Sequence, residues 1–268
     1  PIHTHPTSSA ASDVYKRQHL ILFVFLIFGL LNGRADELPM ALPEDVSMSS
    51  EELKKVDRVI KKFIDDKELA GAVTIIARKG KVIHFSAQGM QDISAAKKME
   101  KDSIFRIYSM TKAVVSVAAM RLVEQGKLKL DVPASTYIPS IAKMKFNGEI
   151  PNREMTLRDL LSHSSGLPNN VSTDRALRVA GHPSLAESNL EEIMGRLESV
   201  PLKYEPGKGW YYSFAADVVG RLVEIGSGLQ LDKALRNLIF DPLGMKDTGF
   251  YVPKDCLLYT SPSPRDGI

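Results

Sequence analysis

Cysteine is almost absent from this chain, since Cys256 is the only one among 268 residues. It lies in a terminal segment that is set aside below, so neither a disulfide nor thiol chemistry can be assigned. The chain also lacks an excess of one charge sign, because 35 basic side chains stand against 32 acidic ones and the formal net charge is +3. The two signs are interspersed along the chain. This balance argues against a nucleic-acid-binding protein.

The two ends of the chain are related at the nucleotide level. Residues 13–18 can be encoded by GATGTGTATAAGAGACAG, and the reverse complement of that sequence, read one base further on, encodes residues 256–260. The pattern is typical of translated transposase-type adapters, whereas a natural tail rich in serine and proline gives no reason for complementary codons. We therefore expect residues 1–18 and 256–268 to be adapter-derived, and we exclude them from the fold.

Long hydrophobic runs are scarce in this chain, and the one extended apolar run covers residues 20–31. This run is shorter than the roughly 20 residues of a membrane-spanning helix and resembles the core of a signal peptide. Small residues follow at Gly33 and Ala35, the two positions that a signal peptidase reads, which predicts cleavage after Ala35. We expect residues 19–35 to be a signal peptide and the protein to be secreted or periplasmic. The alternative is an uncleaved anchor, which would be its only membrane contact.

The mature segment, residues 36–255, carries a formal charge of about +1 once the terminal segments are removed. It has no internal repeat and no low-complexity linker, and its length suits one large domain or two small ones. A capping-box pattern at residues 49–52, followed by apolar residues at helical spacing, predicts an amphipathic helix. Two β-rich runs, residues 72–77 and 82–87, flank a turn signal and predict a hairpin.

The centre of the chain is the run Ile107-Tyr108-Ser109-Met110-Thr111-Lys112, followed by apolar residues that predict a buried helix. A serine opening a helix lies near free backbone N–H groups, at the positive end of the helix dipole. Lys112 lies one turn further along the same face, so its amine can approach Ser109 and, if poorly hydrated, act as a base. The alternative is an N-cap serine followed by an exposed lysine, because Ser-x-x-Lys alone occurs by chance.

Two histidines could be ligands or bases, and we interpret both as structural. His84 lies in the second predicted strand, where a lone histidine is usually packed or exposed. His163 lies beside serines in residues 155–167, which predict a short capped helix closed by Gly166. No Gly-x-Ser-x-Gly elbow accompanies His163, so a catalytic Ser-His pair is not favoured.

A Pro206-Gly207 turn leads through Trp210 and two tyrosines into a helix predicted over residues 215–224, with Gly226 as its stop. Aromatic residues after such a turn are usually core anchors. The phenol of Tyr212 at the mouth of a helix, beside a lysine ammonium, could instead have a lowered pKa and pass protons to a leaving group.

Four segments occur in the order seen in the β-lactamase-related serine hydrolases: residues 109–112, 160–167, 206–213 and 242–245. That family holds class C β-lactamases, D-alanyl-D-alanine carboxypeptidases and related esterases. The resemblance implies an α+β fold, with an antiparallel sheet covered by helices and flanked by a helical region. It also implies that Ser109 is the acylated nucleophile, Lys112 its base partner and Tyr212 a proton shuttle. No cofactor and no metal are assigned.

The chain departs from the family pattern at two places. Phe214 stands where the family's Tyr-x-Asn element has its substrate-binding asparagine, which favours an ester-cleaving or otherwise divergent member. The third motif, a Lys/His-x-Gly strand with one oxyanion-hole N–H, should lie downstream of Asp255. We therefore expect the C-terminal strands to be absent, and the chain as written to be inactive.

The functional expectation is an exported serine hydrolase that acts on a small ester, lactam or peptide, most readily an ester. The alternatives are a penicillin-binding or sensor module without turnover, a D-Ala-D-Ala carboxypeptidase and a β-lactamase.

Overall fold

A computed structural model describes residues 38–251, which divide into two units. The first contains the described residues up to Ile104 together with Pro242–Gly244, and the second contains Phe105–Asp241 together with Met245 and the described residues after it. The expected signal peptide, the two segments expected to be adapter-derived and Cys256 lie outside the described residues. Among residues 38–251, no helix is long and apolar enough to span a membrane.

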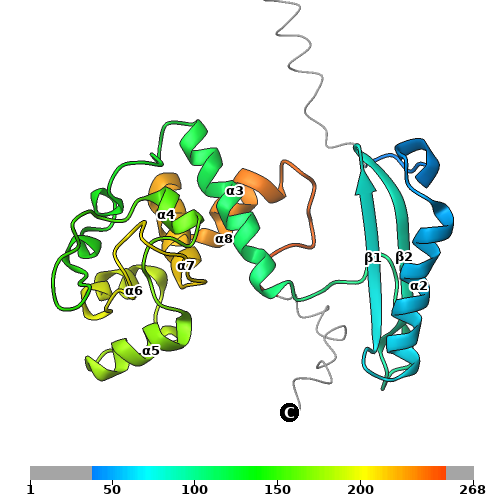
Figure 1. Ribbon diagram of the computed structural model, residues 1–268, viewed down its shortest axis with the longest axis horizontal. Coiled ribbons are helices and arrows are strands. Elements are labelled where there is room, and N and C mark those ends of the chain that lie inside the picture. Colours follow the sequence, from blue (N-terminus) through cyan, green and yellow to red (C-terminus); the bar gives the residue numbers. More distant parts are fainter. Residues whose placement is uncertain (1–37, 252–268) are drawn as a thin grey trace, which may run out of the picture. The chain divides into compact units, whose positions relative to one another are not determined.

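In the first unit a helix packs on a hairpin (Figure 1). The hydroxyl of Ser49 accepts the Glu52 N–H at 3.2 Å, which caps the predicted helix at its start. The helix contacts the second strand, and its apolar face contributes to a small core of Val46, Leu53 and Ile83. The elements in chain order are η1 (Pro43–Val46), α2 (Ser50–Asp65), β1 (Gly71–Arg78), β2 (Lys81–Asp92) and β3 (Lys97–Lys98).

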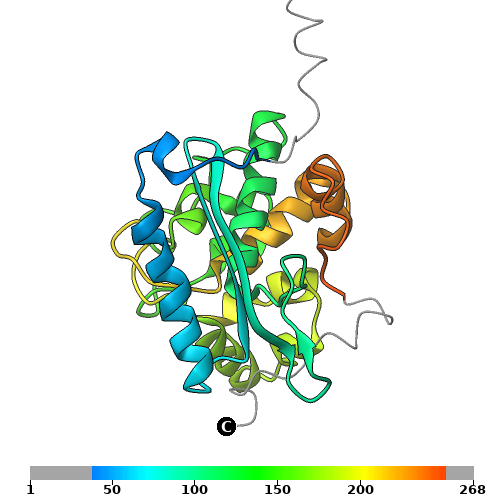
Figure 2. The same ribbon diagram turned by 90° about the vertical axis from the view of Figure 1, so that its right-hand side faces the viewer.

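The strands form an antiparallel sheet in the order β1-β2-β3, and Figure 2 shows the long twisted hairpin that β1 and β2 make. Its two-residue turn has positive φ at both Lys79 and Gly80, which matches the right-handed twist of the strands. His84 is packed as interpreted, because its side chain is 10% exposed and its Nε2 lies 3.0 Å from Thr74 on the neighbouring strand.

The second unit is helical and holds the larger core. The helix α3 packs on α7, and its buried face consists of Val115, Ala118, Ala119 and Leu122. The helices are α3 (Thr111–Glu124), α4 (Leu157–Leu161), α5 (Asn170–Val179), α6 (Leu190–Gly195), α7 (Ala215–Ser227) and α8 (Leu231–Leu235), with short turns η2 (Tyr108–Met110), η3 (Ala134–Thr136), η4 (Pro139–Lys143), η5 (Leu185–Glu187), η6 (Leu197–Ser199) and η7 (Arg236–Phe240).

Two predicted helix boundaries are wrong. Helix α4 starts at the capping box of Thr156 but ends at Leu161, well before Gly166, because the chain leaves the helical conformation at His163, whose φ is 56°. Helix α7 passes through Gly226 and ends before Gly228, which has the left-handed conformation of a C-cap. Gly226 is needed for close packing instead, since a Cβ there would lie 3.1 Å from Leu122 and from Leu128.

The hairpin sheet with its helix and the separate helical unit give the α+β class that was predicted.

Candidate active site

Ser109 lies in η2, a 3-10 turn that precedes α3, and its side chain is exposed. Tyr108, directly before it, has a φ of 42°, which is uncommon for a residue other than glycine and marks a constrained turn. The N-cap of α3 is Met110, and no side chain caps it. The structure therefore excludes the alternative in which Ser109 serves as the N-cap.

Lys112 contacts the Ser109 hydroxyl. Its Nζ atom donates a hydrogen bond to Ser109 Oγ at 3.2 Å, as the one-turn spacing predicted. The same Nζ atom lies 4.8 Å from the ring centroid of Tyr212. The Ser109 hydroxyl and the Tyr212 ring therefore lie near the same Lys112 ammonium, although they are far apart in the sequence.

Tyr212 lies on the extended segment that leads into α7, and it is 45% exposed. Hydrogen bonding to Lys112, and next to Ser109, lowers the pKa of the Tyr212 phenol below its ordinary value. The structure therefore brings together all three side chains that the sequence pattern selected. A hydroxyl, an amine and an acidified phenol within reach of one another can exchange protons.

Phe214 does not join them. Its side chain is 1% exposed and belongs to the core of the second unit, while its backbone N–H donates to Pro168 at 2.9 Å. The expectation that Phe214 binds substrate follows from its sequence position, but a buried aromatic ring at the start of α7 fills the core instead of the site.

His163 lies beside this group, although it was interpreted from the sequence as structural. Its ring packs on Tyr212 with centroids 4.9 Å apart, and on Trp210 edge to face at 6.2 Å. The Ser213 backbone N–H donates to His163 Nδ1 at 3.3 Å, so the serine it meets is not Ser109. Burial, and next the charge of Lys112, lowers the pKa of His163.

His163 also fixes the backbone of the segment that carries Tyr212. It has a φ of 56°, and its carbonyl accepts the Tyr211 N–H at 3.0 Å and the Tyr204 hydroxyl at 3.1 Å. These contacts support the structural interpretation of His163, which holds the segment that carries Tyr212 in place.

A pocket of about 270 Å³ opens beside Ser109 and Lys112. Its other lining residues come from η2, α3, α6, α7, α8 and the end of the described chain: Tyr108, Thr111, Val115, Leu190, Ala216, Asp217, Leu231 and Phe250. Sequence reasoning missed Asp217, although a carboxylate in the first turn of an otherwise apolar helix start was a usable signal. Among residues 38–251, no group of three or more metal-ligating side chains gathers.

Comparisons with known proteins identify the family to which the chain belongs. The beta-lactamase family matches residues 56–261, and the chain belongs to that family. Over 201 residues it is 37% identical to esterase EstB of Burkholderia gladioli, covering 73% of this chain and 51% of that one. Over 209 residues it is 29% identical to lovastatin esterase of Penicillium rubens, covering 73% and 52% respectively.

Among solved structures, EstCE1, described as a hydrolase with promiscuous acyltransferase activity, aligns with a TM-score of 0.69 and 33% identity. The alignment covers 76% of this chain and 54% of EstCE1. The chain thus spans about half the length of the curated relatives it matches. The relatives named here are described as two esterases and a hydrolase.

Proposed function

We propose that the protein is an exported serine hydrolase that cleaves small esters through an acyl-enzyme on Ser109. One observation carries the proposal: the Nζ atom of Lys112 is 3.2 Å from Ser109 Oγ and 4.8 Å from the centroid of the Tyr212 ring. A nucleophilic serine needs a base within hydrogen-bond reach, and that base needs a partner that tunes it. Export is supported by the signal-like pattern of residues 19–35.

In acylation, the pair formed by Lys112 and Tyr212 takes the hydroxyl proton as Ser109 Oγ attacks the ester carbonyl carbon. The tetrahedral intermediate collapses, the bond to the alcohol oxygen breaks, and Tyr212 returns the proton to that leaving oxygen. A phenol of lowered pKa suits both steps, because it is more readily present as phenolate and gives up its proton more readily.

In deacylation, a water molecule attacks the acyl carbon and gives one proton to the same pair. The acid then leaves as the proton returns to Ser109 Oγ, and the starting state is restored. Phe214 replaces the asparagine whose amide would bind a lactam or a peptide in the family pattern. That replacement and the two relatives named as esterases favour an ester as the substrate.

The test uses the full-length gene product that contains this segment. A fluorophosphonate should label the wild type at Ser109 and leave Ser109→Ala unlabelled, whereas Ser172→Ala, an exposed serine on α5, should label like the wild type. The enzyme should turn over p-nitrophenyl butyrate repeatedly, and faster than nitrocefin. Failure of both the fluorophosphonate and a labelled penicillin to acylate Ser109 would remove the proposal. Acylation without deacylation would instead support a sensor or penicillin-binding module.

A further inference from the structure

The pocket beside Ser109 combines apolar walls with one carboxyl group. Val115, Leu190 and Leu231 supply aliphatic surface from three different helices, and Asp217 is the only acidic residue among the described residues that line it. A carboxylate in such surroundings costs free energy unless it is paired with a cation or hydrogen-bonded. The mechanism above uses Ser109, Lys112 and Tyr212, and leaves Asp217 without a role.

Few groups act on the Asp217 carboxyl. Burial raises its pKa, while the charge of Lys112 on α3 and then hydrogen bonding from Asn170 on α5 oppose that rise. Within residues 38–251, Asp217 makes no ion pair within 4 Å. The pocket side chains that α6, α8 and the end of the described chain contribute, Leu190, Leu231 and Phe250, are uncharged.

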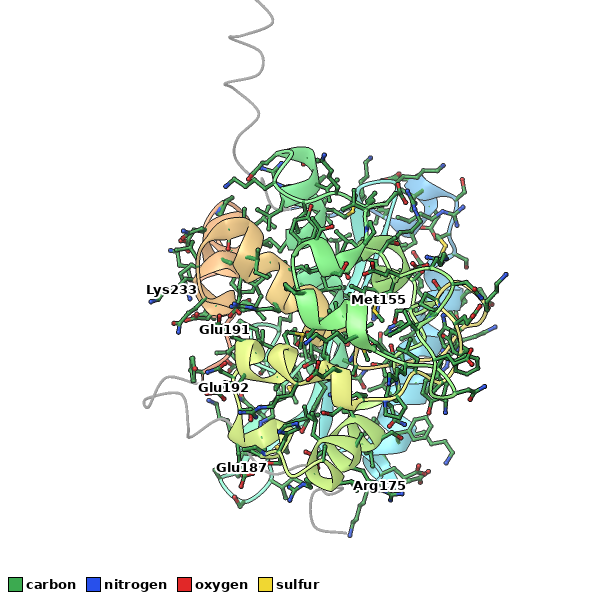
Figure 3. The ribbon with its side chains drawn as sticks, turned by 90° about the vertical axis from the view of Figure 1, so that its left-hand side faces the viewer. Met155, Arg175, Glu187, Glu191, Glu192 and Lys233 are labelled. Carbon is green, nitrogen blue, oxygen red and sulfur yellow. The ribbon has the colours of Figure 1, made fainter. Side chains whose placement is uncertain are left out.

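Charged residues do neighbour the pocket in sequence, but they lie on the surface. Glu191 and Glu192 follow Leu190 on α6, and Lys233 lies two residues after Leu231 on α8 (Figure 3). The Glu191 side chain is 74% exposed and pairs with Arg221. None of the three lines the pocket, and Asp217 and Lys112 are the charged residues among the described residues that do.

The pocket is suited to the acyl arm of an ester. The alcohol leaves toward the group that protonates it, which is Tyr212 in the proposed mechanism, and Tyr212 does not line this pocket. The remaining arm, the acyl chain, is then free to enter between the aliphatic walls. A volume of about 270 Å³ is small beside ordinary ligand pockets and matches a short chain.

We propose that Asp217 is a specificity-determining residue, which makes the pocket accept uncharged acyl chains and reject acyl chains that end in an anion. The inference rests on the proposed function. Two like charges beside apolar walls repel more strongly than two in bulk water, and rejecting one substrate by repulsion is as effective as binding another better. We expect a preference of about tenfold or more for a neutral chain over its anionic counterpart.

The experiment compares two p-nitrophenyl esters on the full-length gene product, the pentanoate and the 4-sulfobutanoate, which share a leaving group and differ in the terminal charge. The wild type should favour the pentanoate in kcat/KM. Asp217→Asn should shrink that preference at least fivefold, and Asp217→Glu should retain it. Asp232→Asn, which removes a carboxylate on α8 that does not line the pocket, should leave the preference unchanged. An equal preference in Asp217→Asn and the wild type would overturn the inference.

The wild type alone gives a second test, in case Asp217→Asn fails to fold. The sulfonate stays charged at every pH used, so the ratio of the two kcat/KM values reports the charge of the pocket, while catalytic effects of Lys112 and Tyr212 that are common to the two esters cancel. The comparison is made on the acidic side, where Lys112 keeps its charge and Asp217 changes its own. The preference for the pentanoate should fall as pH falls through the raised pKa of Asp217, and a flat ratio contradicts the inference. Turnover of both esters without preference defeats this inference and leaves the hydrolase proposal intact. Absence of acylation at Ser109 defeats both.

Discussion

The ammonium of Lys112 lies over the Tyr212 ring, 4.8 Å from its centroid, although 100 positions separate the two residues in the sequence. Hydrogen bonding to that ammonium is the largest cause of the lowered pKa of the phenol. The contact between Lys112 and Tyr212 therefore makes the tyrosine more acidic, while the same ammonium keeps its hydrogen bond to Ser109 Oγ.

Replacing Lys112 with methionine should raise the pKa of Tyr212 toward the ordinary tyrosine range, because the phenolate loses its cationic hydrogen-bond donor. The measurement is an ultraviolet titration of the variant against the same protein carrying Tyr212→Phe. We also expect kcat/KM for a neutral ester to fall by roughly 10²–10⁴, the usual contribution of a positioned base.

Lys203 offers a matched control, because its Nζ atom lies 4.0 Å from the ring centroid of Tyr211. Lys203→Met removes a lysine from an adjacent tyrosine ring and should leave both the Tyr212 titration and the ester hydrolysis as in the wild type. An unchanged Tyr212 titration in Lys112→Met would contradict the proposed pairing.

Replacing His163 with asparagine separates its two roles. Asparagine tolerates the left-handed backbone at φ 56°, and its amide oxygen can accept the Ser213 N–H, but it has no ring to pack on Tyr212. We expect melting close to the wild type and a kcat reduced about tenfold or more, with KM little changed.

His163→Ala should lose the hydrogen bond as well and melt earlier. If His163→Asn reacts with a fluorophosphonate at the wild-type rate, the ring does not position Tyr212.

The sequence allowed the local features to be predicted, because they depend on neighbours. The Ser109 to Lys112 spacing, the cap at Ser49 and the hairpin turn at Gly80 are each set within a few residues. The resemblance to a family then supplied Tyr212, which spacing alone could not connect to Ser109.

What failed depends on tertiary packing. Gly226 reads as a helix stop, yet it lies inside α7 because Leu122 and Leu128 approach the helix too closely for a side chain. Phe214 occupies a position that faces substrate in the family pattern, but an aromatic ring there is drawn into the core. Asp217 reaches the site because α7 places it there, and His163 because the turn after α4 lies against the segment that carries Tyr212.

The ion pair between Arg153 and Asp159 should be a major stabilising contact of the second unit. The guanidinium donates to both carboxylate oxygens, at 2.7 and 2.9 Å, and the Asp159 side chain is 8% exposed. Asp159→Asn should lower the free energy of unfolding by about 3 kcal/mol, because it leaves a partly buried cation without its partner. Denaturant unfolding of the variant measures this.

Asp131 provides the comparison, since it also binds an arginine, Arg158, through two hydrogen bonds at 2.6 and 2.9 Å. Both side chains of that pair are more than 60% exposed, so Asp131→Asn should change the unfolding free energy little. Equal losses in the two variants would mean that burial does not decide the strength of these pairs.

The same pair sets a pH dependence. Burial alone would raise the pKa of Asp159, but hydrogen bonds from Arg153 and Thr156 outweigh it and lower the pKa. A carboxyl whose pKa is depressed on folding adds stability above its unfolded pKa of about 4, and that stability is lost as pH falls through the folded value. The stability of the wild type should therefore decline more steeply below pH 4 than that of Asp159→Asn, as measured by denaturant unfolding across that range.

Gly166 and Gly181 separate backbone strain from steric collision. Both have left-handed backbone, with φ of 84° and 80°. A Cβ on Gly166 would lie 2.3 Å from the Tyr204 carbonyl oxygen, whereas a Cβ on Gly181 would meet nothing within 4 Å. Gly181→Ala should lower the free energy of unfolding by only about 1 kcal/mol, because alanine fits the space there but is strained in the left-handed backbone conformation.

Gly166→Ala should lose considerably more stability than Gly181→Ala, because the backbone at Tyr204 must also move away from the new Cβ. That segment continues to Tyr212, so Gly166→Ala should slow acylation of Ser109 even in the fraction that remains folded, and Gly181→Ala should not. Thermal melting gives the first comparison, and fluorophosphonate labelling corrected for the folded fraction gives the second. Equal melting temperatures for the two variants would show that the Tyr204 carbonyl yields without cost.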